Sequence, residues 1–257
     1  MKYSIYLITG LLFTNTALLH AQPDTSQKTF TPYFESRLVA GFNLGATAPL
    51  GFPNTIRKIH SFWPKFCPAF GYELTYMFNP KWGAGTGIKV EFKGMGTEDQ
   101  VLYFPTIIVV NDGANTGTFT GTFSGKNKTV VNNSYLTFPV IAVFRPNDKW
   151  RFNAGFYFAW LINPEFYGTV SDGYIRNGGP TGERVDIDEA SFDFDTEVRK
   201  FDWGFRGGAA RAVGKRISIN ADLSWGVRPL FPKDFKGLDF PLYNIFAALG
   251  IAYQLKP

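Results

Sequence analysis

Few residues in this 257-residue chain could act as a nucleophile with its base, and they lie in one short segment. His60 stands next to Ser61 and two residues after Lys58, and a serine beside a histidine is the minimum of a hydrolytic pair. A lipid or peptide hydrolase, with its site at the outer rim of the barrel predicted below, is therefore one interpretation. His60 is the one histidine after the predicted signal peptide, and many serines are present, so this proximity is weak support; we expect no catalytic residue and no enzyme.

A cation site is a second possibility, because carboxylates gather in one stretch: Asp186, Asp188, Glu189, Asp193, Asp195 and Glu197. Such oxygens could hold calcium or a divalent counter-ion of lipopolysaccharide, but no twelve-residue ligand loop is present. The glycine-rich run 83–87 looks like a phosphate-binding loop, yet it lies within a strand pattern and precedes no helix. Cys67 is the single cysteine and reads as a small apolar residue. We expect no metal and no cofactor.

The largest constellation is a set of charged residues at alternate positions within apolar stretches: Arg37, Glu73, Lys89, Glu91, Lys93, Arg151, Asp202, Arg206, Asp222 and Arg228. If their strands close into a barrel, these side chains share its lumen. Charges buried there must pair, since an isolated one costs many kcal/mol. Two alternatives stay open, a structural plug of ion pairs and a proton or ion path. An open porin would need about twice as many strands as the eight expected below.

The elements that position these charges are clearest between residues 68 and 93. Two runs of strict alternation flank a short turn at 79–81, which predicts a long β-hairpin. One face carries aromatic and aliphatic residues, and the other carries Gly83, Gly85 and Gly87 beside charges. A glycine-lined face suits a crowded interior, so the apolar face must look outward, which only lipid tolerates. Residues whose numbers sum to about 160–162 should pair across this turn. Glu73 is then roughly opposite Gly87 and diagonal to Lys89.

The rest of the chain repeats this alternation. We expect eight antiparallel strands, near 37–45, 68–78, 82–93, 134–144, 150–161, 201–212, 217–225 and 242–255. Three short turns alternate with four long loops (46–66, 94–133, 163–200 and 229–241), the asymmetry typical of an outer-membrane up-and-down barrel with periplasmic turns and extracellular loops. Segments 102–110 and 116–123 could extend the wall as an arm, and 192–198 alternates as a further strand. We expect bulges at Pro139 and near 199–200.

Aromatic residues flank the predicted turns and strand ends, as at a membrane interface. This predicted girdle comprises Phe78, Trp82, Phe144, Trp150, Trp160, Trp203 and Trp225. No stretch approaches the length of an apolar transmembrane helix. Basic residues scatter despite a pI near 9.2, so we expect no nucleic-acid partner.

The N-terminus fits a secretory signal: Lys2, a mildly apolar run and a small-residue cleavage site at Ala21. We expect a signal peptide at 1–21, a flexible periplasmic leader at 22–32 and one transmembrane barrel domain at 33–257. These features predict the outer membrane of a Gram-negative-type cell, reached by signal-dependent export, with outer-membrane lipid or lipopolysaccharide as surroundings.

Several segments resemble the PorT-like outer-membrane β-barrel family: FNPKWGAGTGIKVEFKG, YLTFPVIAVF with WRFNAGFYFAWLI, FDWGFRGGAA and NIFAALGIAYQL. The resemblance covers essentially the whole mature chain and carries no catalytic signature. It implies contact with the barrel-assembly machinery and, from a member implicated in secretion, with envelope or secretion proteins. We expect a non-catalytic barrel with a plugged lumen and partner- or ligand-binding loops, supporting export or envelope organisation. A narrow ion or small-solute channel and the hydrolase remain alternatives.

Overall fold

The computed structural model describes residues 30–112, 115–177 and 181–256. Contacts divide the chain into residues 1–30 and residues 31–257, and every described element belongs to the second unit. The signal peptide expected at 1–21 and most of the leader expected at 22–32 lie outside the described residues.

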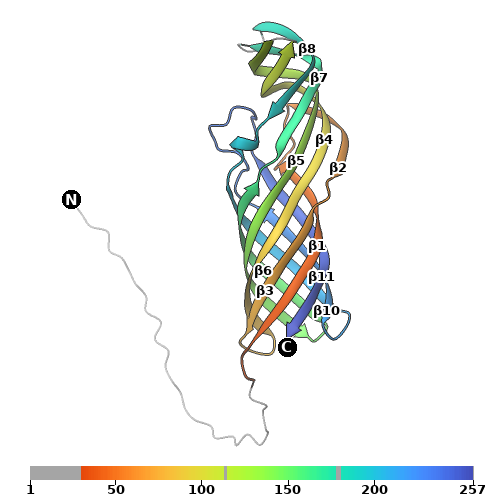
Figure 1. Cartoon of the computed structure of the whole chain (residues 1–257), viewed down its shortest axis with the longest axis vertical. Helices are drawn as coiled ribbons and strands as arrows, with labels where there is room; N and C mark the ends of the chain where they lie inside the picture. The colour runs from red at the N-terminus through yellow and green to blue at the C-terminus, as the bar shows by residue number, and fades with distance from the viewer. Residues whose placement is uncertain (1–29, 113–114, 178–180, 257) are drawn as a thin grey trace, which may run out of the picture. The chain divides into compact units, whose positions relative to one another are not determined.

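The described residues form eleven antiparallel strands and one short 3-10 helix, which confirms the all-β class (Figure 1). The strands are β1 (Tyr33–Pro49), β2 (Ile56–Pro64), β3 (Pro68–Met77), β4 (Trp82–Asp112), β5 (Asn115–Asn147), β6 (Trp150–Asn163), β7 (Phe166–Asn177), β8 (Glu183–Asp193), β9 (Phe201–Ala212), β10 (Ile217–Gly226) and β11 (Leu242–Lys256). The 3-10 helix η1 spans Asp195–Glu197. No helix in the described part of the chain is long and apolar enough to cross a membrane.

Eight of these strands form a closed, barrel-like ring. Hydrogen-bonded neighbours run in the order β4, β3, β1, β11, β10, β9, β6 and β5, and β5 pairs back onto β4. The three short connections β3–β4, β5–β6 and β9–β10 lie at one end, which we call the turn end. Figure 1 shows the strands tilted within the ring, with β7 and β8 beyond its other end.

The expected total of eight strands was wrong, because three more form in segments expected to be loops. β2 lies within 46–66, where prolines delimit strands instead of preventing them: Pro49 ends β1 and Pro64 ends β2. β7 and β8 lie within 163–200. β4 and β5 pair from Trp82 to Asp112, so the predicted arm at 102–110 and 116–123 is confirmed. We call β2, β7, β8 and residues 94–133 of β4 and β5 the extension.

Three local expectations were also wrong. The strand expected at 192–198 ends at Asp193 and gives way to η1, where the Asp195 carboxylate accepts the Phe166 backbone N–H. The apolar side chains change from even-numbered to odd-numbered positions there because a new strand, β9, starts at Phe201. No bulge is therefore needed at 199–200. Pro139 causes no bulge either, since the β5–β6 register runs unbroken through its pair with Tyr157.

Side chains alternate across the ring wall as the pattern predicted. Apolar side chains such as Leu38, Ile88, Phe156, Leu223 and Leu249 are exposed on the outside, while the alternate residues are buried inside. The main cluster of buried apolar side chains begins inside the ring, at the end away from the turns, with Tyr135, Tyr157, Ala159 and Leu161. From there it continues between the extension and residues 229–242. The ring is therefore apolar outside and carries charged side chains within, and most of the conventional core sits beyond it.

Candidate functional site

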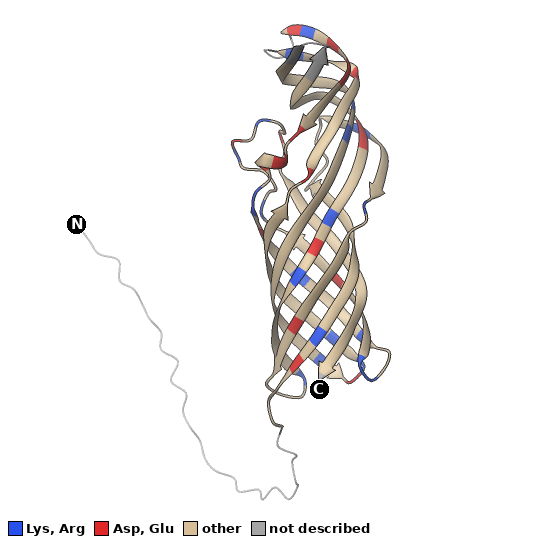
Figure 2. Cartoon of the chain, viewed as in Figure 1, with Lys and Arg blue, Asp and Glu red and all other residues tan. Residues whose placement is uncertain are grey.

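The structure places nine of the ten predicted lumen residues in ion pairs inside the ring. Figure 2 shows charged positions along the ring strands, in contrast to the uncharged remainder of the wall. The pairs form three levels, which we call the lower level, nearest the turn end, the middle level and the upper level, nearest the extension.

The lower level is built on Glu73 of β3. Lys89 Nζ lies 2.7 Å from Glu73 Oε1, and Arg37 on β1 pairs with the other oxygen of the same carboxylate. Glu73 is directly opposite Gly87, so Lys89 is its diagonal neighbour. The predicted hairpin register is confirmed.

A second part of the lower level spans the ring. Arg151 on β6 places Nη1 3.3 Å from Glu35 Oε2 on β1 and donates from Nη2 to Thr75 Oγ1 at 2.6 Å. Arg145 also pairs with Glu35. Strands β1 and β6 are four places apart in the eight-stranded ring, which means that they face each other. The wall is glycine here because a Cβ on Gly85 would lie 3.2 Å from Thr75 Oγ1 and 3.1 Å from the Ile141 side chain.

The middle level centres on Arg206 of β9, which is 5 % exposed. Its Nη1 lies 3.1 Å from Glu91 Oε1 on β4, and its Nη2 lies 3.3 Å from Asp222 Oδ2 on β10. Asn153 Nδ2 donates to the second oxygen of Asp222 at 3.1 Å. One guanidinium thus joins three strands.

The upper level surrounds Lys93, a fully buried lysine on β4. Its Nζ lies 3.8 Å from Asp202 Oδ2, 4.6 Å from the Tyr157 ring centroid and 5.1 Å from that of Tyr135. Tyr157 and Asn244 both donate to Asp202 at 3.0 Å, and Asn244 Nδ2 also donates to Tyr135 Oη at 3.3 Å. Because β11 and β5 are four places apart in the ring, this last contact also reaches between facing strands.

Sequence reasoning placed Arg228 in the lumen, and this was wrong. Arg228 lies after the end of β10, donates to the Phe201 carbonyl at 3.3 Å and makes no ion pair with a described residue. Sequence reasoning also missed Glu35, Arg145 and Asn244. Glu35 continues the alternation of Arg37 by one step, so starting the strand two residues earlier would have found it.

The predicted girdle residues lie at two levels on the outer face. Trp82 pairs with Phe144 in register, their ring centroids 4.6 Å apart, and Phe78 and Trp150 lie at the same turn end. Trp160, Trp203 and Trp225 lie near the opposite ends of their strands and are exposed. An apolar band therefore runs between two aromatic levels.

The segment around His60 and the acidic stretch were the two places where the sequence offered catalytic or metal-binding side chains. His60 is exposed on β2 and hydrogen-bonds neither Ser61 nor a carboxylate among the described residues. Within the same described part of the chain, no group of three His, Cys, Asp or Glu residues is placed to hold a metal ion.

Cavities lie at both ends of the charged interior. The apolar cavity, about 430 Å³, sits under the extension and is lined by Ile56, Met95, Phe104, Leu238, Phe240 and Leu242, among others. Thr47 lines its floor and donates to Asn244 of the upper level at 2.9 Å. The side-chain oxygens Asp99 Oδ1 and Asn127 Oδ1 are buried without a hydrogen-bond partner, on residues that also line this cavity. Burial raises the pKa of Asp99 above its usual value.

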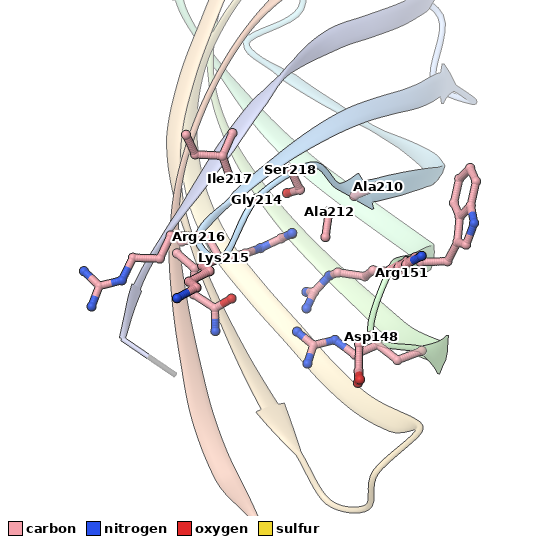
Figure 3. A pocket seen from close by; sticks show the side chains of 14 residues that line it. Asp148, Arg151, Ala210, Ala212, Gly214, Lys215, Arg216, Ile217 and Ser218 are labelled. Carbon is pink, nitrogen blue, oxygen red and sulfur yellow. The ribbon is translucent and has the colours of Figure 1, made fainter.

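The basic cavity, about 360 Å³, lies at the turn end and is lined by Arg37, Arg145, Arg151, Lys149 and Lys215 (Figure 3). A single carboxylate, Asp148, lies among its lining residues. The two cavities thus differ in chemistry and are separated by the three levels of ion pairs.

A closed ring of tilted antiparallel strands, apolar outside between two aromatic levels and charged within, defines an outer-membrane β-barrel protein. Residues 21–232 match the family model of the outer membrane protein beta-barrel domain, and the chain belongs to that family. The strands of the ring are transmembrane strands, and the protein is located in the outer membrane. In such proteins the short turns face the periplasm and the longer connections face outward.

Among solved structures, the chain is similar to Ail, the attachment invasion locus protein of Yersinia pestis. Its crystal structure with the heparin analogue sucrose octasulfate is 12 % identical over 86 % of this chain and 97 % of that one, with a TM-score of 0.33. Its backbone structure in a phospholipid bilayer nanodisc is 14 % identical over 87 % and 100 %, with a TM-score of 0.30. These values are too low to transfer residues or ligands. No curated protein sequence matches the chain.

Proposed function

We propose that this protein is a non-catalytic, non-conducting outer-membrane barrel that captures an apolar small molecule in its outward-facing mouth. The observation that supports this most directly is the apolar cavity, which lies at the outward end of a lumen crossed by ion pairs and hydrogen bonds. A molecule that enters the cavity from outside would meet the ion pairs and stop.

The contacts that cross the lumen favour a structural plug of ion pairs over an ion-conducting path. Contacts between facing strands occur at two levels, through Arg151 with Glu35 and through Asn244 with Tyr135. An eight-stranded barrel is about wide enough for side chains to fill its interior. Moving these groups aside would separate buried charges from their partners, at a cost of about 3–5 kcal/mol for each broken pair. An ion would find no continuous aqueous route.

The lining of the apolar cavity indicates the ligand class. Its volume, about 430 Å³, lies within the range of small-molecule sites. Most lining side chains are aliphatic or aromatic, and the two polar oxygens without partners, Asp99 Oδ1 and Asn127 Oδ1, are acceptors on neighbouring residues of β4 and β5. We infer a ligand with an apolar body and one hydrogen-bond donor.

The test combines conductance with ligand binding. Wild-type protein in planar bilayers should be electrically silent, and in nanodiscs it should bind N-phenyl-1-naphthylamine, an apolar probe with one N–H, saturably above empty nanodiscs. Ala46→Phe, which fills the cavity, should weaken this binding at least about tenfold. Ala84→Phe, on the exposed outer face of β4, is the matched control and should bind as wild type. Discrete conductance steps, or equal binding by all three proteins, would refute the proposal.

The PorT-like resemblance supports a wider role that we propose for the same extension. The face of the extension opposite the cavity carries polar and charged side chains, including Lys58, Glu98, Lys126 and Lys128. An envelope or secretion protein would dock there, after export directed by residues 1–21 and insertion by the barrel-assembly machinery. Crosslinking through Lys126 and Lys128 in intact cells, against a variant with both changed to Gln, should capture such a partner only with the wild type.

A further inference from the structure

The basic cavity at the turn end has a charge imbalance that the ion pairs do not resolve. The lower level contains four cations, Arg37, Lys89, Arg145 and Arg151, and two carboxylates, Glu35 and Glu73, which leaves an excess of two positive charges. Each carboxylate is shared by two cations. Concentrated positive charge with low exposure is costly unless an anion offsets it.

Two donors at this cavity also have no acceptor. The Nε–H groups of Arg37 and Arg151 are buried without a hydrogen-bond partner, on side chains that are 8 % and 5 % exposed. Both residues line the cavity, and Figure 3 shows the Arg151 side chain extending into it. A buried donor without a partner destabilises the folded protein, so an oxygen-rich ligand that these two side chains could turn toward is favoured in this cavity.

The rim adds charge of the same sign. Lys149 and Lys215 line the cavity opening from the β5–β6 and β9–β10 turns, with Asp148 as the one nearby acid. Arg216 of the β9–β10 turn also lines the cavity, but its Nη1 lies 3.4 Å from Tyr253 Oη, which holds its guanidinium at the outer face. Lysines at the opening and arginines further inside create a positive electrostatic potential that attracts anions.

We propose that this cavity is an anion site for a phosphate group, facing the periplasm. Guanidinium groups bind tetrahedral and planar oxyanions through several N–H donors at once. The volume, about 360 Å³, exceeds what one phosphate fills, so the group can carry a small polar substituent. Inorganic phosphate and the headgroup of an anionic phospholipid share this chemistry.

The most direct test variant introduces a carboxylate of the protein itself into the cavity, in place of the proposed anionic ligand. Ala212 on β9 lines the cavity, has a small half-buried side chain and is a diagonal neighbour of Arg151, within reach of a long side chain. Ala212→Glu should place a carboxylate among the arginines and occupy the site. Ala212→Gln has the same size without the charge and is the matched control.

The experiment uses the full mature protein in maltoside micelles without phosphate, with sodium phosphate as the titrant and sodium chloride of equal ionic strength as reference. Phosphate should bind saturably by calorimetry and delay heat unfolding, measured as loss of the fast-migrating folded band on gels. Ala212→Glu should lose phosphate binding at least about tenfold and unfold at higher temperature than Ala212→Gln, which should still bind.

Short-chain phosphatidylglycerol, added below its micelle concentration, distinguishes the two sources. If it displaces phosphate and binds more tightly, the headgroup is the natural ligand; if it does not compete, the free ion is, and both outcomes support the site. Equal effects of phosphate and chloride, or equal phosphate binding by the Glu and Gln variants, would overturn the proposal. None of these readouts depends on the apolar cavity or on conductance.

Discussion

Neutralising Glu73 is the most informative single perturbation of the lumen. Its carboxylate lies 2.7 Å from Lys89 Nζ and also pairs with Arg37, and neither cation has another carboxylate within ion-pair distance in the described chain. All three side chains are at least nine-tenths buried. Glu73→Gln therefore strands two buried cations, and breaking a buried pair in this way costs about 3–5 kcal/mol.

The double variant Glu73→Gln with Lys89→Met should recover about half of that loss, because one of the two stranded cations is removed. Unfolding free energies can be measured by urea titration in lipid vesicles, with the folded fraction read from gel mobility. Asp172→Asn is the control: it breaks the exposed pair with Lys126, at 2.9 Å, and should cost less than about 1 kcal/mol.

The competing interpretation makes opposite predictions for the same proteins. If the lumen conducts, water and ions already screen Glu73, so its neutralisation would change stability little and would alter ion selectivity in planar bilayers. A Glu73→Gln protein that is as stable as wild type and conducts would refute the plug.

Three further predictions test the membrane band, the extension and the fold. Ile88→Lys, within the outward band, should destabilise by about 2–4 kcal/mol, whereas Tyr76→Lys, nearer the turn end, should cost about 0–1 kcal/mol; equal costs in vesicle unfolding would argue against a bilayer-facing wall. Because the pKa of Asp99 is raised in the folded protein, its protonated form is favoured there, so unfolding free energy should fall as pH rises from about 4 through the raised pKa. Asp99→Asn should remove that fall and be more stable than wild type at pH 7, and an unchanged pH profile would contradict this assignment. Mature protein should need detergent and migrate faster on gels unheated than boiled, whereas recovery as a soluble monomer would contradict the fold.

The ring was predictable because its signal is local. Alternation in β3 and β4 gives the face of every residue, and a short turn gives the register, so the Glu73–Lys89 neighbours follow from numbering alone. Contacts between facing strands carry no such signal. Nothing in the sequence near Arg151 indicates Glu35, which is 116 residues away, and nothing near Tyr135 indicates Asn244.

The extension shows why loop composition misled the strand count. Glycine, threonine, asparagine and proline are frequent in connections, yet here they lie in β2, β7 and the upper parts of β4 and β5, where pairing with neighbouring strands stabilises them. The prediction for Arg228 was wrong for a related reason. Side chains alternate between the inner and outer face only within a strand, and β10 ends at Gly226. Tertiary pairing, which a single sequence does not reveal, decides both cases.

The pairing of β4 with β5 over most of their length has a mechanical consequence. At about 3.3 Å per residue, the 31 residues of β4 have a contour of about 100 Å, whereas the apolar band of a barrel is about 25 Å tall. The hairpin therefore continues well past the bilayer, with one register shift between Val101 and Phe104. A load applied at its far end would pass along this pairing into the ring, where Trp82 and Phe144 pair at the opposite interface.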